Sequence, residues 1–536
     1  MTTRPNVLWL MSDQHNANCT GYRDHPNVKT PSLDRIAAQG VDFTHAYANN
    51  PICAPSRICF MTGEYMHHHR FFGNYNFAYP EPKHEHLGYC FRMHGYQTAL
   101  IGKSHMVGKW DRDGFEHIRY CDLIDSDRRD PLTNHYFKYL YDRGLADMYE
   151  EGTPKDGQEY TMDGSGPAKL PYEHSIERFT GNESLAFLEG RDRRRPFFLQ
   201  MSFQRPHAPI APSAEHFDMY DPDDIVLPDN AVDWLENEFA GKPAILRDRL
   251  LRGSSYPLAD KDPARLRRVL ASYYALISVI DSEIGRVLDY LEESGELENT
   301  IVFYTADHGD FAGEHGLFHK NFGLYESITK IPFLLSWPGG PKAVQDDALV
   351  ESVDLFPTLC SLCDVPLPDG RDGVDLTARV RSATTRAGDQ AAGNAAADAN
   401  AAAKDAAAKD AAFTEWQWAG RQISAMRTRD YRLVYYQGET EGELYDHRED
   451  PGELKNVWNE PSYAGIRHEL LMRLLGFTLD YDKASEGADD RRKKHADRLT
   501  PGEAVQFGKV YWSDLERVYT ERRPVGGGAA RESRRP

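Results

Sequence analysis

The stretch "NVLWLMSDQH", residues 6–15, joins a short apolar run to a polar cluster. A run of this length, rich in branched and aromatic side chains, indicates a strand in a sheet that is covered on both faces. Four further runs have the same character: "QTALIG" (97–102), "PFFLQMSF" (196–203), "TIVFYTA" (300–306) and "PFLLSW" (332–337). We therefore expect all five runs to be buried strands of one sheet.

Helical periodicity separates these runs. The clearest helix is predicted over 265–294, where Ile277, Ile280 and Ile284 begin a series of apolar residues at three- and four-residue steps and Gly295 supplies the stop. Strands that alternate with helices favour an α/β fold. We expect an open, mostly parallel sheet flanked by helices.

Composition divides the rest of the chain. Residues 384–412 are alanine-rich with a repeated AAAKD unit, which is typical of an insertion without chemistry. Residues 413–480 contain two strands joined by a tight turn and then a helix, which predicts a smaller C-terminal α+β subdomain. The charged tail, 481–536, is expected to be loose or to dock on a sister subunit, and we expect a homo-oligomer. The catalytic α/β domain is predicted over 1–383.

Charge and cysteine content narrow the class of protein. The 536 residues carry 63 Lys+Arg and 83 Asp+Glu, a net charge of −20, which opposes binding to nucleic acid or to anionic lipid surfaces. An anionic substrate would therefore need a locally positive pocket. The first apolar run is too short for a secretory signal or a membrane span, so we expect a cytoplasmic protein. The seven scattered cysteines fit reduced thiols.

A polar cluster follows each of four predicted strands. Asp-Gln-His stands at 13–15, Lys-Ser-His at 103–105, Arg-Pro-His at 205–207 and Asp-His-Gly at 307–309. In doubly wound sheets, ligands bind beyond the carboxyl ends of the strands. We therefore expect the four clusters to meet at one site.

The stretch "PICAPSRICFMTGEY", residues 51–65, adds a cysteine to this site. Pro55 and Ser56 indicate the start of a helix, so that free backbone N–H groups and the helix dipole would face a group beside Cys53. Arg57, one turn later, would add a fixed positive charge. The pattern predicts an anion site next to Cys53. The histidine-rich run 67–70 is interpreted as surface at the rim of this pocket.

Residues 53–57, Cys-Ala-Pro-Ser-Arg, followed by Met-Thr-Gly at 61–63, resemble the C-x-P-x-R signature of type I sulfatases, the formylglycine-dependent enzymes of the alkaline phosphatase superfamily. Other segments resemble the family in the family's order, from about residue 5 to about residue 477, among them "LIGKSHMVGKW", "FQRPHAPIAP", "YTADHGDFAGEHGLFHK" and "GELYDHREDPGELKN". The resemblance implies an alkaline phosphatase-like fold and hydrolysis of an aryl or small alkyl sulfate monoester. It also implies a formylglycine-generating maturation enzyme that converts Cys53.

The resemblance carries roles over to this chain. The implied ligands of one divalent metal ion are Asp13, Gln14, Cys53 as formylglycine, Asp307 and His308. The hydrated aldehyde beside this ion would provide the oxygen that attacks sulfur. Arg57 and Lys103 are expected to hold the formylglycine and the sulfate oxygens, with Lys320 beside them. His207 is expected to protonate the leaving alcohol, and His105 to act as the base that releases sulfate.

The metal ligands depart from the commonest family pattern. Many sulfatases have Asp-Asp at the first cluster and Asp-Asn at the last, whereas this chain has Asp13-Gln14 and Asp307-His308, which is more similar to choline sulfatases and phosphonate monoester hydrolases. One carboxylate fewer and one imidazole more favour manganese over an all-oxygen calcium site. Ca²⁺ and Mn²⁺ both stay open.

Two other functions are compatible with these residues. A phosphonate monoester or phosphodiester hydrolase would share the nucleophile, although Lys103 and His105 together favour a sulfatase. The other alternative is a catalytically silent scaffold that binds a metal or an anion, with Cys53 unconverted. Mass spectrometry of the peptide 51–70 distinguishes the scaffold from the enzymes.

Overall fold

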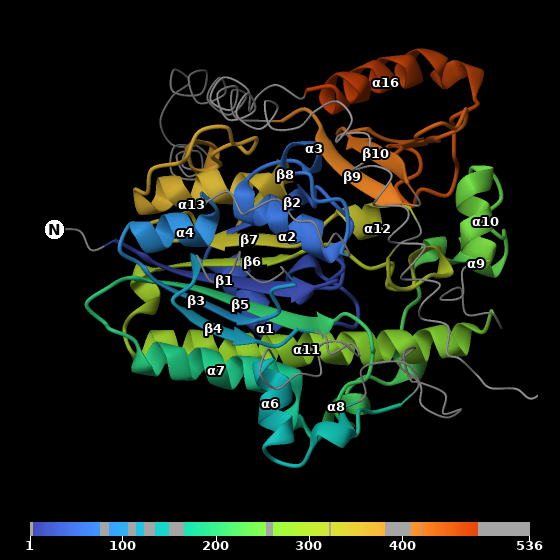
Figure 1. Cartoon of the computed structure of the whole chain (residues 1–536). Helices are drawn as coiled ribbons and strands as arrows, with labels where there is room; N and C mark the ends of the chain where they lie inside the picture. The colour runs from blue at the N-terminus through green and yellow to red at the C-terminus, as the bar shows by residue number, and fades with distance from the viewer. Residues whose placement is uncertain are drawn as a thin grey trace, which may run out of the picture. The chain divides into compact units, whose positions relative to one another are not determined.

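The five predicted runs are neighbouring strands in the interior of an eight-stranded sheet (Figure 1). They are β3 (Gln97–Gly102), β5 (Phe197–Pro206), β1 (Asn6–Asp13), β6 (Thr300–Ala306) and β7 (Phe333–Ser336), in that order across the sheet. The computed structural model describes residues 4–74, 85–105, 114–122, 134–149, 166–252, 261–320, 323–380, 409–418 and 420–480.

Three strands that the sequence did not predict complete the sheet. β4 (His117–Tyr120) lies at one edge, and β2 (Val41–Tyr47) and β8 (Val344–Glu351) lie at the other. Each contains polar residues within it, so none presents a continuous apolar run. Neighbouring strands pair in parallel except for β7, which is antiparallel to both β6 and β2. The predicted α/β fold with a mostly parallel sheet is confirmed.

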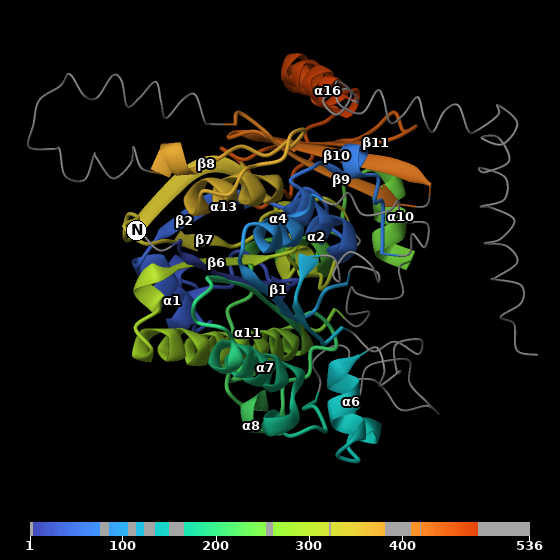
Figure 2. The ribbon, with the colours of Figure 1, turned by 60° about the vertical axis from the view of Figure 1, so that its left-hand side comes forward.

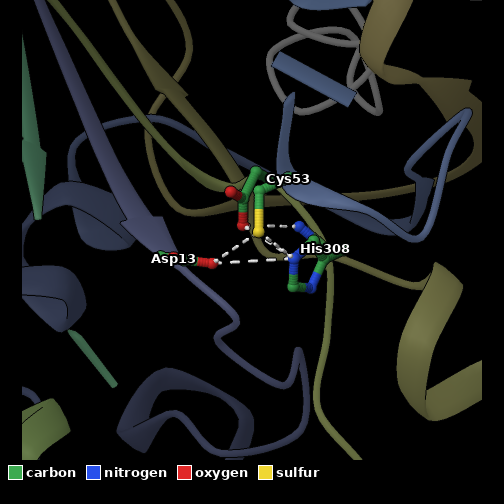
Figure 3. Close-up of side chains that lie close together, drawn as sticks. Asp13, Cys53 and His308 are labelled. Atoms are coloured by element: carbon green, nitrogen blue, oxygen red, sulfur yellow. Dashed lines mark hydrogen bonds and ion pairs between the residues drawn. The ribbon is translucent and has the colours of Figure 1, made fainter. Parts of the chain in front are cut away.

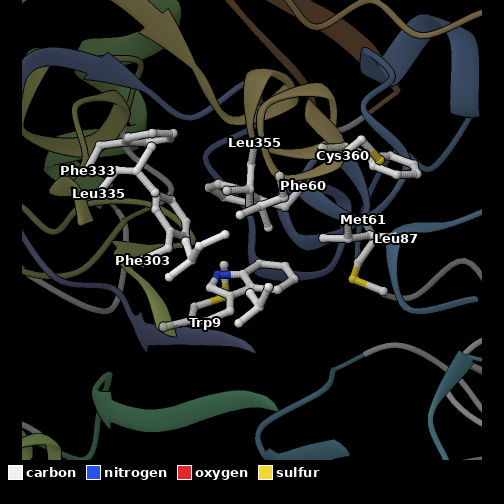
Figure 4. Packing of buried hydrophobic residues seen from close by; sticks show 14 of the residues in the cluster. Trp9, Phe60, Met61, Leu87, Phe303, Phe333, Leu335, Leu355 and Cys360 are labelled. Atoms are coloured by element: carbon white, nitrogen blue, oxygen red, sulfur yellow. The ribbon is translucent and has the colours of Figure 1, made fainter. Parts of the chain in front are cut away.

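Helices α2 (Cys53–Thr62), α4 (Leu87–Met93) and α13 (Leu355–Cys363) cover one face of this sheet. Alternate strand residues such as Trp9, Phe303 and Leu335 point into this core, where they meet Phe60 and Leu355 from the helices (Figure 4). Burial of each such side chain contributes about 1.5–3 kcal/mol to folding. This core fixes α2, and therefore Cys53, against the sheet.

Helices α1 (Pro31–Ala38), α7 (Ile176–Gly190) and α11 (Pro263–Glu293) cover the opposite face (Figures 1 and 2). Helix α11 agrees with the helix predicted over 265–294 within two residues at each end, and its residues Ile280 and Ile284 pack on Leu8 and Leu10 of β1. Among the described residues, no helix is both long and apolar enough to cross a bilayer. Shorter helices are α3 (Met66–His69), α6 (His135–Tyr141), α8 (Ala214–Phe217), α9 (Val232–Leu235), α10 (Ala244–Arg252) and α12 (Glu326–Thr329).

A four-stranded antiparallel sheet follows, in the order β12-β11-β10-β9. Its strands are β9 (Ala412–Trp418), β10 (Arg421–Arg427), β11 (Tyr431–Tyr436) and β12 (Glu443–Asp446). Helix α16 (Ala464–Thr478) packs Leu470 and Leu474 against this sheet. The predicted hairpin and helix are therefore present.

Two details differ from what the sequence suggested. Lys409, within the expected insertion 384–412, is half-buried and lies 2.6 Å from the buried carboxylates of both Glu351 and Asp354, whose negative charges it balances. Residues 409–412 thus belong to the folded part. Residues 384–408 and the tail 481–536 lie outside the described residues, and the other domain boundaries stay predictions.

Two residues of the histidine-rich run are buried, which corrects the interpretation of the whole run as surface. His67 and His69 are buried within and at the end of α3. His67 Nδ1 lies 2.7 Å from Glu415 of β9, and His69 Nε2 lies 3.3 Å from Cys59 of α2. These polar partners explain why imidazoles are accommodated in the interior.

Candidate active site

Four adjacent parallel strands end beside one another. β3, β5, β1 and β6 are consecutive in the sheet, so their carboxyl ends share one edge. Asp13 ends β1, Lys103 directly follows β3, and Asp307 directly follows β6. The strand order therefore brings together clusters that lie up to about 300 residues apart in the sequence.

Cys53 is the first residue of α2 and lies among potential metal ligands (Figure 3). Ligand atoms of Asp13, Cys53, Asp307 and His308 are all within 4.8 Å of one another, and all four residues are buried. The Sγ atom lies 3.3 Å from His308 Nε2 and 3.6 Å from Asp13 Oδ1. Two carboxylates and an imidazole in a buried site form a donor set that suits a divalent cation.

The orientation of His308 also fits a metal. Its Nδ1 lies 2.9 Å from the carbonyl oxygen of Gly309. Because a carbonyl only accepts, Nδ1 carries the hydrogen and Nε2 presents its lone pair to the cluster. This arrangement, in which the second ring nitrogen is bonded to a carbonyl, is the usual one for a metal-binding histidine.

Gln14 is held so that its amide oxygen faces the same cluster. Its φ of 67° lies in the left-handed region, and its backbone N–H donates to Asp307 Oδ1 at 3.0 Å. Its side-chain Nε2 donates to Asp310 at 2.5 Å. The remaining atom, Oε1, accepts from Lys320 Nζ at 2.9 Å. The amide oxygen is therefore placed where it could also face a cation.

Lysine and arginine side chains surround Cys53. Lys320 Nζ lies 2.9 Å from Cys53 Sγ and 3.0 Å from His308 Nε2. Lys103 forms an ion pair with Asp13 Oδ2. Arg57 Nε donates to Asp307 Oδ2 at 2.8 Å, while its buried Nη2 has no acceptor among the described residues. An unused buried N–H is a donor available to an anion.

These charges change the ionisation of the site. Burial and Asp13 oppose ionisation of the Cys53 thiol, but Lys103, Lys320 and His308 outweigh them and lower its pKa to about 5. Burial likewise raises the pKa of Asp13, but Lys103 and the other cations hold that pKa well below its usual value. A site that stabilises anions this strongly is suited to an anionic ligand.

His207 and His105 are placed differently. The backbone N–H of His207 donates to Asp13 O at 3.2 Å, and burial lowers the pKa of its imidazole well below the usual value although the Asp13 carboxylate opposes this. His105 has a left-handed φ of 53°, and its backbone N–H donates to Asp122 at 2.9 Å. His105 stands two residues after Lys103 in the sequence, and its role as a base at the cluster stays a prediction.

Sequence reasoning missed two residues of β5 that support the site. Gln204 Nε2 donates to Asp13 Oδ2 at 3.2 Å, and Ser202 Oγ accepts from Arg57 Nη1 at 2.8 Å. Both are buried polar side chains two residues apart, so they lie on the same face of the strand. Polar residues at every second position of an otherwise apolar strand were the sequence signal by which Ser202 and Gln204 could have been recognised.

Comparison with known proteins places the chain in a family. The model of the sulfatase family matches residues 5–365, and that of the N-sulphoglucosamine sulphohydrolase C-terminal region matches residues 396–479. An arylsulfatase from Clostridium perfringens is 28% identical over 502 residues, which cover 91% of this chain and 97% of that protein. An N-acetylglucosamine-6-O-sulfatase from Bacteroides thetaiotaomicron is 26% identical over 531 residues, covering 88% and 86%.

The fold has close counterparts among solved structures. A phosphonate monoester hydrolase from Silicibacter pomeroyi superposes with a TM-score of 0.71 at 23% identity, covering 90% of this chain and 96% of that one. Members of the sulfatase family generally use a divalent metal and a formylglycine, and the cluster around Cys53 has residues suited to both. The chain therefore belongs to the sulfatase family, the sulfuric ester hydrolases of the alkaline phosphatase superfamily.

Proposed function

We propose that this enzyme hydrolyses an aryl or small alkyl sulfate monoester, using a formylglycine made from Cys53 and one divalent metal ion. The observation that carries the proposal is the position of Cys53 at the start of α2, 2.9 Å from Lys320 Nζ and within 4.8 Å of the carboxylate and imidazole ligands. When formed, the hydrated aldehyde supplies an oxygen nucleophile for sulfur.

Asp13, Gln14, Asp307 and His308 would hold the metal ion together with residue 53. The ion supplies a positive charge that lowers the pKa of a hydroxyl bound to it. Carboxylate, amide and imidazole donors together favour Mn²⁺, and Ca²⁺ is the second candidate because three of the side chains offer oxygen. Elemental analysis of the purified enzyme after growth with both ions would identify the one retained.

Arg57, Lys103 and Lys320 bind the sulfate oxygens in this proposal. All three are buried, so their charges are only weakly screened by water. Burial lowers the pKa of Lys320, but Cys53 and the two aspartates outweigh it and raise that pKa, which keeps the ammonium charged. Donors fixed before the substrate arrives stabilise charge that develops in the transition state.

His207 would protonate the leaving oxygen. Its Nδ1 lies 2.8 Å from the carbonyl oxygen of Ala208 and carries a hydrogen toward it, so Nε2 is the atom that delivers the proton. Burial lowers the pKa of the imidazole and so favours its neutral form, whereas a bound sulfate anion would favour the protonated form. His105 is proposed as the base that accepts a proton when sulfate is released.

The alternative is a phosphonate monoester or phosphodiester hydrolase with the same nucleophile. The Asp-Gln and Asp-His ligand pairs and the fold shared with the Silicibacter pomeroyi hydrolase favour it. Lys103 and His105 favour the sulfatase, because an additional cation and a base suit a sulfated intermediate state.

The test is a comparison of two substrates. The chain is produced with a formylglycine-generating enzyme, and conversion of Cys53 is verified by mass spectrometry of the peptide 51–70. We expect kcat/KM to be larger for an aryl sulfate than for an aryl phosphonate monoester, and Cys53→Ala to abolish both activities. A larger value for the phosphonate would establish the alternative, and an unconverted thiol in active, natively matured enzyme would contradict the nucleophile.

A further inference from the structure

A second group of potential metal ligands lies between α12 and the segment that follows β12. Ligand atoms of Glu326, His447 and Glu453 are within 4.8 Å of one another. Arg432 already forms ion pairs with both carboxylates, and Arg427 Nη2 lies 2.9 Å from His447 Nδ1. These arginines neutralise the carboxylates, so the group is a closed network of ion pairs rather than a cation site.

This network holds both ends of the short helix α12. Glu453 Oε2 accepts from the backbone N–H of Glu326 at 2.8 Å, at the start of the helix. Arg432 Nη1 donates to Leu324 O and to Thr329 Oγ1, at 3.0 Å each, before the helix and at its end. The side chains of Arg432 and Glu453 are only 1% and 2% exposed, so water does not compete for these bonds.

Helix α12 in turn contacts the loop that carries His308. The backbone N–H of Gly309 donates to Ile328 O at 2.8 Å. The two segments pack so closely that a Cβ at Gly309 would lie 1.9 Å from Ser327 O. Because Gly309 O accepts from His308 Nδ1, the position of residue 309 helps to set the direction of the imidazole.

We propose that Arg432 and Glu453 are positioning residues for the metal centre. They fix α12, α12 fixes residue 309 through its backbone N–H, and the carbonyl of residue 309 orients His308. The proposal rests on the role of His308 as a metal ligand in the proposed function. In this proposal, β11 of the C-terminal sheet affects metal binding through Arg432, although the bonds of Arg432 are to α12 and its neighbours and not to the reacting groups.

The test measures metal binding directly. Arg432→Lys keeps the buried charge but cannot bond Leu324 O, Thr329 Oγ1 and both carboxylates at once. We expect the Kd for Mn²⁺, measured by calorimetry on the full chain, to rise on the order of tenfold, as is usual when a partner of a metal ligand is lost. We expect kcat for an aryl sulfate to fall with it, while KM changes by less than about twofold.

The matched control is Arg429→Lys. Arg429 precedes the same strand and pairs with Asp347 of β8, but both side chains are largely exposed, at 68% and 50%. Its replacement should leave the Mn²⁺ affinity unchanged. A folded Arg432→Lys variant with wild-type affinity, or an equal loss in Arg429→Lys, would overturn the proposal.

A second variant keeps the test decisive if Arg432→Lys does not fold. Thr329→Val removes one bond between Arg432 and α12 without changing charge, and we expect a loss of Mn²⁺ affinity of about threefold. Unchanged affinity there would also refute the proposal. A wild-type chain that binds Mn²⁺ but hydrolyses no sulfate ester would reject only the proposed function, whereas a wild-type chain that binds no metal would reject both.

Discussion

Replacement of Lys320 by methionine should return the Cys53 thiol to an ordinary pKa in the unconverted chain. The pKa of Cys53 is lowered from 9.0 to about 5, against burial and Asp13, because Lys103, Lys320 and His308 are close to the sulfur. Lys320 Nζ is 2.9 Å from Sγ. The same positive potential is proposed to hold the substrate sulfate, so the thiol acts as a built-in probe of that potential.

The distance sets the size of the effect. Two unit charges 2.9 Å apart attract by about 6 kcal/mol at an effective dielectric constant of about 20. This energy corresponds to about four pKa units. Loss of Lys320 alone is therefore sufficient to raise the pKa of Cys53 from about 5 to near the ordinary value of 9.0. Methionine has a similar length and keeps most of the packing.

The assay is an ultraviolet titration of thiolate absorbance in metal-free protein produced without the maturation enzyme. The background is low, because burial raises the pKa of every other cysteine: Cys19, Cys59, Cys90, Cys121, Cys360 and Cys363. We expect one thiol to ionise near pH 5 in the wild type and none in the acidic range in Lys320→Met. Cys53→Ser provides the blank.

Lys138→Met is the matched control, since Lys138 is exposed and, within the described part of the chain, forms an ion pair with Asp142 one turn away. It should leave the titration of Cys53 unchanged. A thiol that still ionises near pH 5 in Lys320→Met would refute the reasoning, because the potential at residue 53 would then arise from other groups.

Three further outcomes are expected. His207→Ala should lower kcat/KM on the order of 10²–10⁴-fold for an alkyl sulfate but far less for a nitrophenyl sulfate, whose leaving group needs little protonation, and equal losses in the two assays would exclude His207 as the acid. Removal of divalent ions with a chelator should abolish turnover and lower the melting temperature, with Mn²⁺ restoring both, whereas activity that survives complete removal of metal would exclude the metal site. Burial raises the pKa of Glu453, but Arg432 and His447 outweigh burial and lower this pKa from 4.5 to about 2. The stability that the Glu453 carboxylate contributes is therefore complete above pH 4.5 and is lost as the pH falls toward 2. Urea midpoints should therefore fall more steeply with acid in the wild type than in Glu453→Gln, and parallel curves would contradict this account.

The sequence predicted the interior of the sheet because continuous apolar runs have one common cause, burial on both faces. It predicted the meeting of the four polar clusters because parallel strands share an edge. Strand β2, "VDFTHAY", was not predicted, since Asp42 and His45 interrupt its apolar pattern. The antiparallel direction of β7 has no signal in a short apolar run.

Contacts between distant parts of the chain were beyond sequence reasoning. Gln204 reaches Asp13 only because β5 and β1 are neighbours, and Lys409 is recognisable as structural only once Glu351 and Asp354 lie beside it. The surface position predicted for His67 and His69 was wrong, because a histidine-rich composition does not show whether polar partners are available in the interior. In each case the missing knowledge was the identity of a neighbour far along the sequence.

All ten residues of α2 are buried, and Cys53 is 1% exposed. In the folded chain, Cys53 and the helix that follows it are therefore not accessible to a modifying enzyme. If Cys53 is converted as proposed, the conversion would therefore take place before the chain has folded, during or just after synthesis. We expect purified, folded protein in which Cys53 is still a thiol to stay inactive when the maturation enzyme is added afterwards.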